Sequence, residues 1–232
     1  MTMNNSRKAP KAGKPYSHTQ RRGDKRRQRL LQVATKLLTH MELPDLTYAA
    51  VCSAAGVPPG SARFFYPDLK ALFQALLAEF TAAHDAAMAR PLRARDLRNW
   101  RTVLECMIDR VAQFHRNHPV ASKLTIGGHA PPDLKRIDRD NDLSRARFFR
   151  ALLEEHFVVP RLEDPDRVFF LVAEIVDSAF TLSMRESGRL LPAWIEHAKV
   201  ASCTFLAHHF GGELKRRSLA PARKSTRARR HA

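Results

Sequence analysis

Cysteines and long apolar runs are scarce in this sequence of 232 residues. The three cysteines, Cys52, Cys106 and Cys203, are odd in number and widely spaced. That spacing excludes a disulfide framework and a CxxC metal motif and favours a reducing cytoplasm, with a redox-sensing thiol as the less favoured alternative. No stretch reaches the roughly 18 consecutive apolar residues of a membrane helix, and the basic N-terminus lacks the apolar core of a signal peptide. We therefore expect a cytoplasmic protein with no membrane partner.

Motifs that carry enzyme chemistry are also missing. The chain contains no nucleophile elbow, no glycine-rich phosphate loop and no paired metal motif. His115, His118, His129 and Asp133 suggest a metal site, but the proline that follows His118 favours a turn there over ordered metal ligands. We therefore expect solvated or capping histidines, no metal or other cofactor, and no enzymatic activity, with a metal-dependent hydrolase as the alternative left open.

Acidic residues are outnumbered by basic ones, 23 Asp and Glu against 40 Lys and Arg, which gives a net charge of +17. Residues 1–29 carry +9 and residues 213–232 carry +7, so the body of the chain is nearly neutral. Such an excess points to a polyanionic partner. We expect two disordered basic segments, residues 1–23 and 213–232. Either they follow a DNA backbone or enter its minor groove, or they only aid solubility and bind nucleic acid non-specifically.

Residues 47–73 have the pattern of two short helices joined by a tight turn. Thr47 is a typical cap for the first helix, over residues 48–55, and Gly56 supplies the backbone freedom that the end of this helix needs. Two adjacent prolines then favour the start of a second helix, over residues 60–65. This order is the helix-turn-helix signature, in which the second helix enters the DNA major groove.

Residues 25–80 resemble the N-terminal domain of the tetracycline-repressor (TetR) family of bacterial regulators. The residues at matching places are Gly56, Val57, Gly60, Ser61, Phe65, Tyr66, Leu72 and Phe73. Three departures stand out. Arg63 replaces a tyrosine that usually contacts phosphate, Leu69 replaces a lysine with Lys70 one residue later, and residues 41–44 replace a glycine turn.

The DNA-contacting residues are predicted to lie on and around these two helices. Arg63 can form a bidentate contact with guanine or grip a phosphate, the alternative being an ordinary surface arginine. Pro59 either touches a thymine methyl or simply starts its helix. Hydroxyls and helix N-termini suit phosphate, although Thr47 also serves as a plain cap. The predicted set is Thr47, Tyr48, Pro59, Ser61, Arg63, Phe64 and Lys70.

Apolar residues recur at three- and four-residue steps through the rest of the chain and predict further helices. One helix, capped by Asp24, precedes the helix-turn-helix pair, and a long one follows Asp68. No alternating strand pattern competes with this interpretation, so we predict an all-α fold of about nine helices. The later helices are expected over residues 100–114, 121–126, 137–157, 164–185 and 191–210, with a loop over residues 129–136.

Two folded domains are predicted, a DNA-binding domain over residues 24–68 and a ligand-binding and dimerisation domain over residues 69–212. The resemblance implies a homodimer in which the last two helices of each subunit form a four-helix interface. It also implies a palindromic operator with one recognition helix per half-site. The nearly all-apolar run over residues 168–182 needs cover on both sides. A charge at Phe180 or Leu206 is expected to disrupt the dimer or the fold.

Several large side chains of the second domain could line an apolar ligand cavity, although each alone could equally belong to the core. The predicted lining consists of Trp100, Met107, Phe114, Phe149, Phe170 and Asp177. Asp177 has the alternative of pairing across a subunit interface. The resemblance implies that an unidentified small molecule alters the separation of the two DNA-binding heads and releases the DNA.

The sequence therefore predicts a sequence-specific DNA-binding transcriptional regulator. We expect a repressor released from double-stranded operator DNA by a small apolar or aromatic ligand. The alternative is a ligand-independent, nucleoid-type DNA-binding protein in which the basic tails dominate. That alternative predicts steep salt dependence with no preference among DNA sequences.

Overall fold

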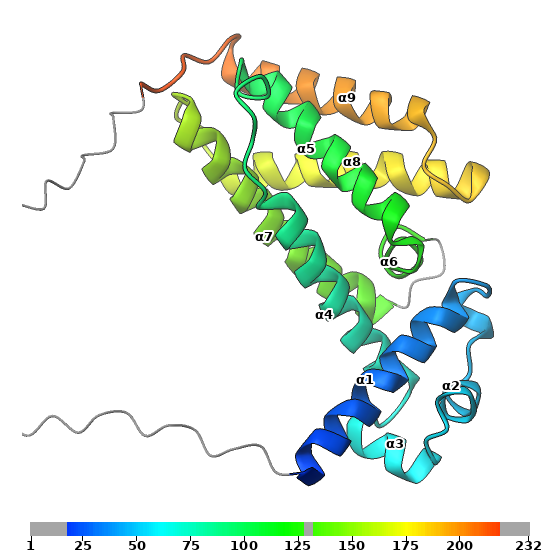
Figure 1. Ribbon diagram of the computed structural model, residues 1–232. Helices are drawn as coiled ribbons and strands as arrows, with labels where there is room; N and C mark the ends of the chain where they lie inside the picture. Colours follow the sequence, from blue (N-terminus) through cyan, green and yellow to red (C-terminus); the bar gives the residue numbers. More distant parts are fainter. Residues whose placement is uncertain (1–17, 128–131, 219–232) are drawn as a thin grey trace, which may run out of the picture.

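The computed structural model describes residues 18–127 and 132–218, which form nine α-helices, one short 3-10 helix and no β-strand (Figure 1). This confirms the all-α prediction. The elements are α1 (His18–Leu38), η1 (Leu43–Asp45), α2 (Tyr48–Ala55), α3 (Pro59–Phe65), α4 (Leu69–Met88), α5 (Trp100–Asn117), α6 (Pro119–Leu124), α7 (Pro132–His156), α8 (Pro165–Ser187) and α9 (Pro192–Phe210). Most of the two predicted basic segments and His129 lie outside the described residues.

Local sequence explains where several helices begin. The Thr47 hydroxyl oxygen accepts a hydrogen bond from the Ala50 N–H at 3.1 Å, and Asp68 caps α4 in the same way. At the start of α5, Asn99 and Thr102 satisfy each other's backbone N–H groups in a capping box. These caps provide partners for N–H groups that lack one inside the helix, so the sequence defines these helix starts directly.

Two helix starts differ from the sequence prediction. α1 begins at His18, so Asp24 lies inside the helix and the predicted cap there is wrong. The residues between His18 and Asp24 include Gln20, Arg21 and Arg22, which are good helix formers but give no apolar pattern. α7 begins at Pro132, so the loop predicted over residues 129–136 is wrong from residue 132 onward. Proline is well suited to the first position of a helix.

The segment after α9 is held against the end of α7. The Val158 N–H donates to the Lys215 carbonyl at 2.8 Å, and the Arg217 N–H donates to the His156 carbonyl at 2.8 Å. The Arg217 Nε also donates to the carbonyl of Phe157 at 3.0 Å. The first residues of the predicted C-terminal tail therefore have a fixed place on the body of the protein.

Two hydrophobic cores are arranged along α4. The first core joins α1–α3 to the first half of α4, including Leu72 and Leu76, and to Val120 and Leu124 of α6. The second core lies among α5, α7, α8 and α9, and Met88 at the end of α4 belongs to it. Figure 1 shows α1–α3 at one end of the molecule and α4 leading away from them. The predicted division after residue 68 stays a prediction, since the packing around the head continues into α4 and α6.

Candidate functional site

A left-handed turn sets the orientation of α3. Gly56 has φ of 62°, a conformation that favours glycine, and the Val57 N–H donates to the Cys52 carbonyl at 3.0 Å. The side chains of Val57 and Ala62 are buried in the core of the head. One face of α3 is therefore fixed against the protein, which leaves the opposite face for a partner.

The outer face of α3 carries a cation and an aromatic ring. Pro59, Arg63 and Phe64 are exposed, and Ser61 is partly buried. Phe64 is 86% exposed, the highest value among the exposed large apolar residues of the described chain. An arginine and an apolar ring on a recognition helix match the chemistry that reads guanine and the thymine methyl group. Lys70 is exposed on the first turn of α4, just beyond this face.

The two hydroxyls predicted to contact phosphate differ in their availability. The Thr47 oxygen accepts the Ala50 N–H, which leaves its own O–H able to donate to a phosphate. The Tyr48 hydroxyl already donates to the Tyr66 carbonyl at 2.6 Å. Tyr48 therefore holds the end of α3 against the start of α2, and a phosphate contact through its hydroxyl would have to break this bond.

The early part of α1 brings basic residues to the head, and two of them, Arg21 and Arg22, belong to the segment over residues 1–23 that was predicted to be disordered. Gly23 packs against the Phe65 ring, since a Cβ at Gly23 would lie 3.7 Å from that ring. The Arg27 Nε donates to the Tyr66 hydroxyl at 3.3 Å. These contacts hold the start of α1 beside α3, as Figure 1 shows. The exposed basic residues brought there are Arg21, Arg22, Lys25, Arg26 and Arg29.

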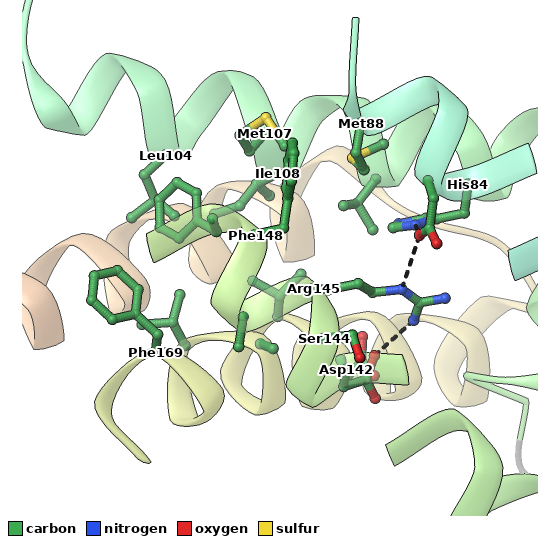
Figure 2. A pocket seen from close by; sticks show the side chains of 18 of the residues that line it. His84, Met88, Leu104, Met107, Ile108, Asp142, Ser144, Arg145, Phe148 and Phe169 are labelled. Carbon is green, nitrogen blue, oxygen red and sulfur yellow. Dashed lines mark hydrogen bonds and ion pairs between the residues drawn. The ribbon is translucent and has the colours of Figure 1, made fainter. Parts of the chain in front are cut away.

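A cavity of about 320 Å³ lies among α4, α5, α7 and α8 in the second core (Figure 2). Its volume is at the lower end of the range typical of small-molecule sites. Met107, Phe149 and Asp177 of the predicted set line it. Phe148 and Phe169, also aromatic candidates from the sequence, line it as well. Sequence reasoning did not assign the other lining residues to the site, among them His84, Met88, Leu104, Ile108, Asp142, Arg145, Val172 and Val176.

Three residues predicted for the cavity lie elsewhere. Trp100 is fully buried, donates from its indole N–H to the Gly212 carbonyl at 3.2 Å, and anchors the start of α5 to the end of α9. Phe114 packs against the rings of neighbouring histidines. Phe170 lies under the Arg139 guanidinium at 5.6 Å on another face of α8. The structure therefore corrects the predicted lining at these three positions. The sequence could not separate them, because aromatic residues of the core and of a cavity lining have the same helical spacing.

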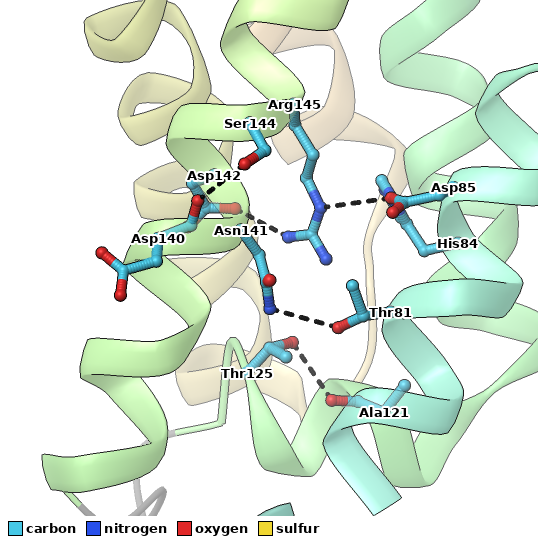
Figure 3. A network of polar contacts seen from close by, with 10 residues as sticks. All are labelled: Thr81, His84, Asp85, Ala121, Thr125, Asp140, Asn141, Asp142, Ser144 and Arg145. Atoms are coloured by element: carbon cyan, nitrogen blue, oxygen red, sulfur yellow. Dashed lines mark hydrogen bonds and ion pairs between the residues drawn. The ribbon is translucent and has the colours of Figure 1, made fainter.

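Charged groups gather at one end of this otherwise apolar cavity (Figure 3). The Arg145 Nη1 contacts the Asp142 Oδ1 at 2.7 Å, and its Nε lies 4.0 Å from the Asp85 Oδ1. Asp142 is buried, and burial raises the pKa of its carboxyl against the opposing effects of Arg145 and of a hydrogen bond with Asp177. Polar groups from α4, α7 and α8 therefore meet at this end.

Two buried histidines, His84 and His115, also line the cavity. Burial, reinforced by the nearby Arg145 charge, lowers the pKa of His84 from 6.5 to about 4. Burial lowers the pKa of His115 from 6.5 to about 3, and His84, Arg145 and His118 add to this effect. The His115 Nδ1 lies 3.1 Å from the Ser122 hydroxyl oxygen. Both rings are therefore neutral at pH 7.

The free energy of unfolding should fall as the pH drops from about 6.5 towards 4. The unfolded chain protonates His84 and His115 over this range while the folded protein keeps them neutral, so acid favours unfolding. The loss should approach about 1.4 kcal/mol per pH unit for each histidine. Urea denaturation at a series of pH values measures this slope. His115→Gln removes one of the two titrating groups, so it should reduce the slope of unfolding free energy against pH by about 1.4 kcal/mol per pH unit. An unchanged slope in the variant would contradict the assignment.

A lysine of α6 links the cavity helices to the head. The Lys123 Nζ donates to the carbonyls of Leu38 at 3.0 Å and Met41 at 2.9 Å, and it pairs with Glu42 at 2.8 Å. These carbonyls lie at the C-terminal end of α1, where a cation is favourable. α6 follows α5 directly, so a movement of α5 at the cavity has a route to the head.

The three thiols lack the character of reactive cysteines. Burial raises the pKa of the Cys52 and Cys106 thiols and raises that of Cys203 to about 11. A reactive cysteine needs a lowered pKa, because the thiolate is the nucleophile. The structure therefore gives no support to a redox-sensing thiolate at these positions.

No metal site or membrane span is found in the part of the chain that the structure describes. Its histidines, cysteines and carboxylates form no group of three or more that could hold a metal ion. His129 lies outside the described residues. None of the helices in residues 18–127 and 132–218 combines the length and apolar character needed to cross a bilayer.

Comparisons with known proteins agree with this architecture. Residues 98–210 match the family model described as the tetracyclin repressor-like C-terminal domain. None of the curated proteins matches the chain in sequence. A TetR-family transcriptional regulator from Streptomyces coelicolor is 22% identical with a TM-score of 0.62, over 79% of this chain and 99% of that one. A TetR transcription regulator from Haloarcula marismortui is 15% identical with a TM-score of 0.58, over 83% of this chain and 100% of that one.

A third solved structure holds a small molecule. RolR, solved in complex with the ligand resorcinol, is 17% identical with a TM-score of 0.53, over 79% of this chain and 88% of that one. At these identities the solved structures show the shared fold, and the matched C-terminal domain adds the family. With a helix-turn-helix head in front of that domain, the chain belongs to the TetR family of ligand-responsive, DNA-binding transcriptional regulators.

Proposed function

We propose that this protein is a cytoplasmic, homodimeric repressor that binds a palindromic operator and is released from it by a small apolar or aromatic molecule. The observation that carries the proposal is the outer face of α3. Arg63 and Phe64 are exposed to solvent there, while the buried Ala62 packs the opposite face of the helix against the core. α4 then connects this head to the cavity. The proposal includes no enzymatic activity.

The DNA contacts should spread beyond α3. Arg63 and Phe64 face the bases, while Thr47, Lys70 and the exposed basic residues at the start of α1 suit phosphates. Phosphate contacts fix the orientation of the head, and base contacts give the sequence preference. The basic residues of α1 therefore contribute mainly to affinity and to its salt dependence.

The dimer should form through α8 and α9, which lie side by side. Along α8, Leu171, Ile175, Ser178 and Leu182 recur at steps of four, three and four residues and form a mostly apolar stripe, in which Ile175 is partly buried and the other three are exposed. Val200 is exposed on α9. Apolar stripes of this kind mark interaction surfaces, and a two-fold axis would place the same stripe of a second copy against it.

Release should follow from a change in the position of the head. A ligand in the cavity contacts α4, α5, α7 and α8 together, and α4 and α6 both reach the head. Lys123 transmits a movement of α6 to the end of α1 through its two carbonyl contacts. A ligand that binds better when the heads are displaced shifts the population towards the released state. RolR, a relative in fold, is likewise solved with a small ligand.

Filling the cavity should abolish the ligand response and leave DNA binding intact. Ala173 lines the cavity, so Ala173→Phe places a ring in the space that a ligand would occupy. A screen of small aromatic and apolar compounds, read as thermal shift and as release of fluorescent operator DNA, should give hits with the wild type and none with this variant. Ala86→Phe, on an exposed position of α4, is the matched control and should respond normally. A variant that binds operator and still releases it with the same compounds would place the ligand elsewhere.

A further inference from the structure

The two ends of the cavity differ in chemistry, and this difference restricts the ligand. Figure 2 shows Leu104 and Phe169 at one end and His84, Asp142 and Arg145 at the other. The apolar end suits an aromatic ring or a compact alkyl body. The ligand should therefore be amphiphilic, with one polar head directed towards the charged end.

The charged end holds more carboxyl groups than cations. Asp85, Asp142 and Asp177 line the cavity together with one guanidinium, that of Arg145. His84 is buried and neutral at pH 7, so it adds no positive charge. Asp142 shares a hydrogen bond with Asp177. Even with one proton held between these two carboxyls, two carboxylates face one guanidinium.

The guanidinium of Arg145 is already engaged by acidic partners. Asp142 holds it at 2.7 Å on one side and Asp85 lies 4.0 Å away on the other. An anionic ligand would have to displace the Asp142 carboxylate and would then lie beside two groups of its own sign. Like charges repel, and the repulsion is strongest next to the buried Asp142, whereas Asp85, with a side chain that is 59% exposed, contributes less. A ligand carboxylate is therefore disfavoured, in spite of the arginine.

We propose, on the basis of the proposed function above, that the effector is a small aromatic or apolar amine, bound in its protonated form with the ammonium group beside the hydrogen-bonded pair of Asp142 and Asp177. The ammonium donates hydrogen bonds to carboxylate oxygens and balances the surplus negative charge at this end. The apolar body fills the end lined by Phe169 and Leu104. A neutral alcohol keeps the donor and lacks the charge, so it binds more weakly than the amine and more tightly than a carboxylate.

A matched series of ligands tests this order directly. Phenethylamine, phenethyl alcohol and phenylacetate share a ring and a short linker and differ in the charge of the head. Isothermal titration of the full-length protein at pH 7 should rank the amine first, the alcohol second and phenylacetate last. The gap between amine and phenylacetate should be at least about tenfold in Kd, roughly 1.4 kcal/mol. Equal or tighter binding of phenylacetate would overturn the proposal, as would the absence of binding by all three.

Two variants locate the preference at the charged end. Asp177→Asn should bring the affinity for phenethylamine down to that for the alcohol and leave the alcohol nearly unchanged. Glu174→Gln removes a carboxylate from the same helix at a position outside the cavity lining, and it should change neither affinity. An unchanged amine preference in Asp177→Asn would overturn the assignment. Binding in the predicted order without release of operator DNA would leave the amine site standing and contradict the proposed repressor function.

Discussion

Leu182→Glu should convert the protein from a dimer to a monomer and weaken operator binding by about 100-fold or more. Leu182 is 44% exposed on the uncovered stripe of α8, where the proposed two-fold interface would bury it. Leaving an unpaired charge in such an interface costs about 3–5 kcal/mol, and each 1.4 kcal/mol corresponds to about tenfold in affinity. Because each half-site then has to be bound by a separate subunit, operator affinity should fall with dimer affinity.

Light scattering at micromolar concentration, together with operator titration, measures both effects. Val158→Glu is the matched control, because Val158 is 53% exposed after the end of α7 and does not belong to the uncovered stripe of α8. It should remain dimeric and bind operator normally. A charge at Phe180 or Leu206 was predicted from sequence to disrupt the dimer or the fold, and both residues are fully buried in the core of their own chain. A charge at either one would unfold the subunit, so neither tests the interface. A wild-type monomer, or a dimeric Leu182→Glu variant, would contradict the proposed interface.

Arg63→Ala should weaken operator binding by about 1–3 kcal/mol, a factor of roughly 5 to 150. Arg63 is exposed on the outer face of α3 and lies beside Phe64 in the position from which a recognition helix reaches the bases. The change removes no contact that the head needs for folding, since Ala62 and Val57 provide the burial on the inner face. The loss should therefore appear in DNA binding and not in thermal stability.

The pattern of that loss identifies the role of Arg63. If Arg63 reads guanine, the loss of affinity is confined to one base position in each half-site. Operators altered at that position should then bind Arg63→Ala and the wild-type protein with equal affinity. If it grips phosphate, the loss is the same for every operator, and the slope of log affinity against log salt falls by about 0.9 for each phosphate that the variant no longer neutralises. Arg95→Ala, an exposed arginine after α4, is the matched control and should bind DNA as the wild type does. If Arg63→Ala binds operator as tightly as the wild type, Arg63 is not part of the DNA interface.

The helix-turn-helix could be predicted because its signals are local. Thr47, Gly56 and Asp68 each determine a helix end through their own backbone or side-chain chemistry, and the apolar stripes of α5, α8 and α9 follow helical spacing. The start of α1 could not be predicted in this way. Its order depends on contacts of Gly23 with Phe65 and of Arg27 with Tyr66, which are far apart in sequence.

The cavity was predicted less completely than the fold. Helical spacing separates buried from exposed residues but does not show where four helices leave a gap between them. Trp100 lies on α5 as Met107 does, yet it packs at the end of α9 outside the cavity. The charged end was missed because Asp142 and Arg145, three residues apart on one helix, have the spacing of an ordinary surface ion pair. The burial of Asp142 beside Asp177 is a property of the packed structure.

Selection of bound sequences from a pool of random duplex DNA by the full-length protein tests the central claim most directly. The account predicts enrichment of a two-fold symmetric sequence, with two half-sites read by the two copies of α3. Affinity for this sequence should exceed affinity for its scrambled counterpart by about a thousandfold or more at physiological salt. Failure to enrich any sequence, with equal and steeply salt-dependent binding to all DNA, would contradict the account and favour a nucleoid-type protein governed by its basic segments.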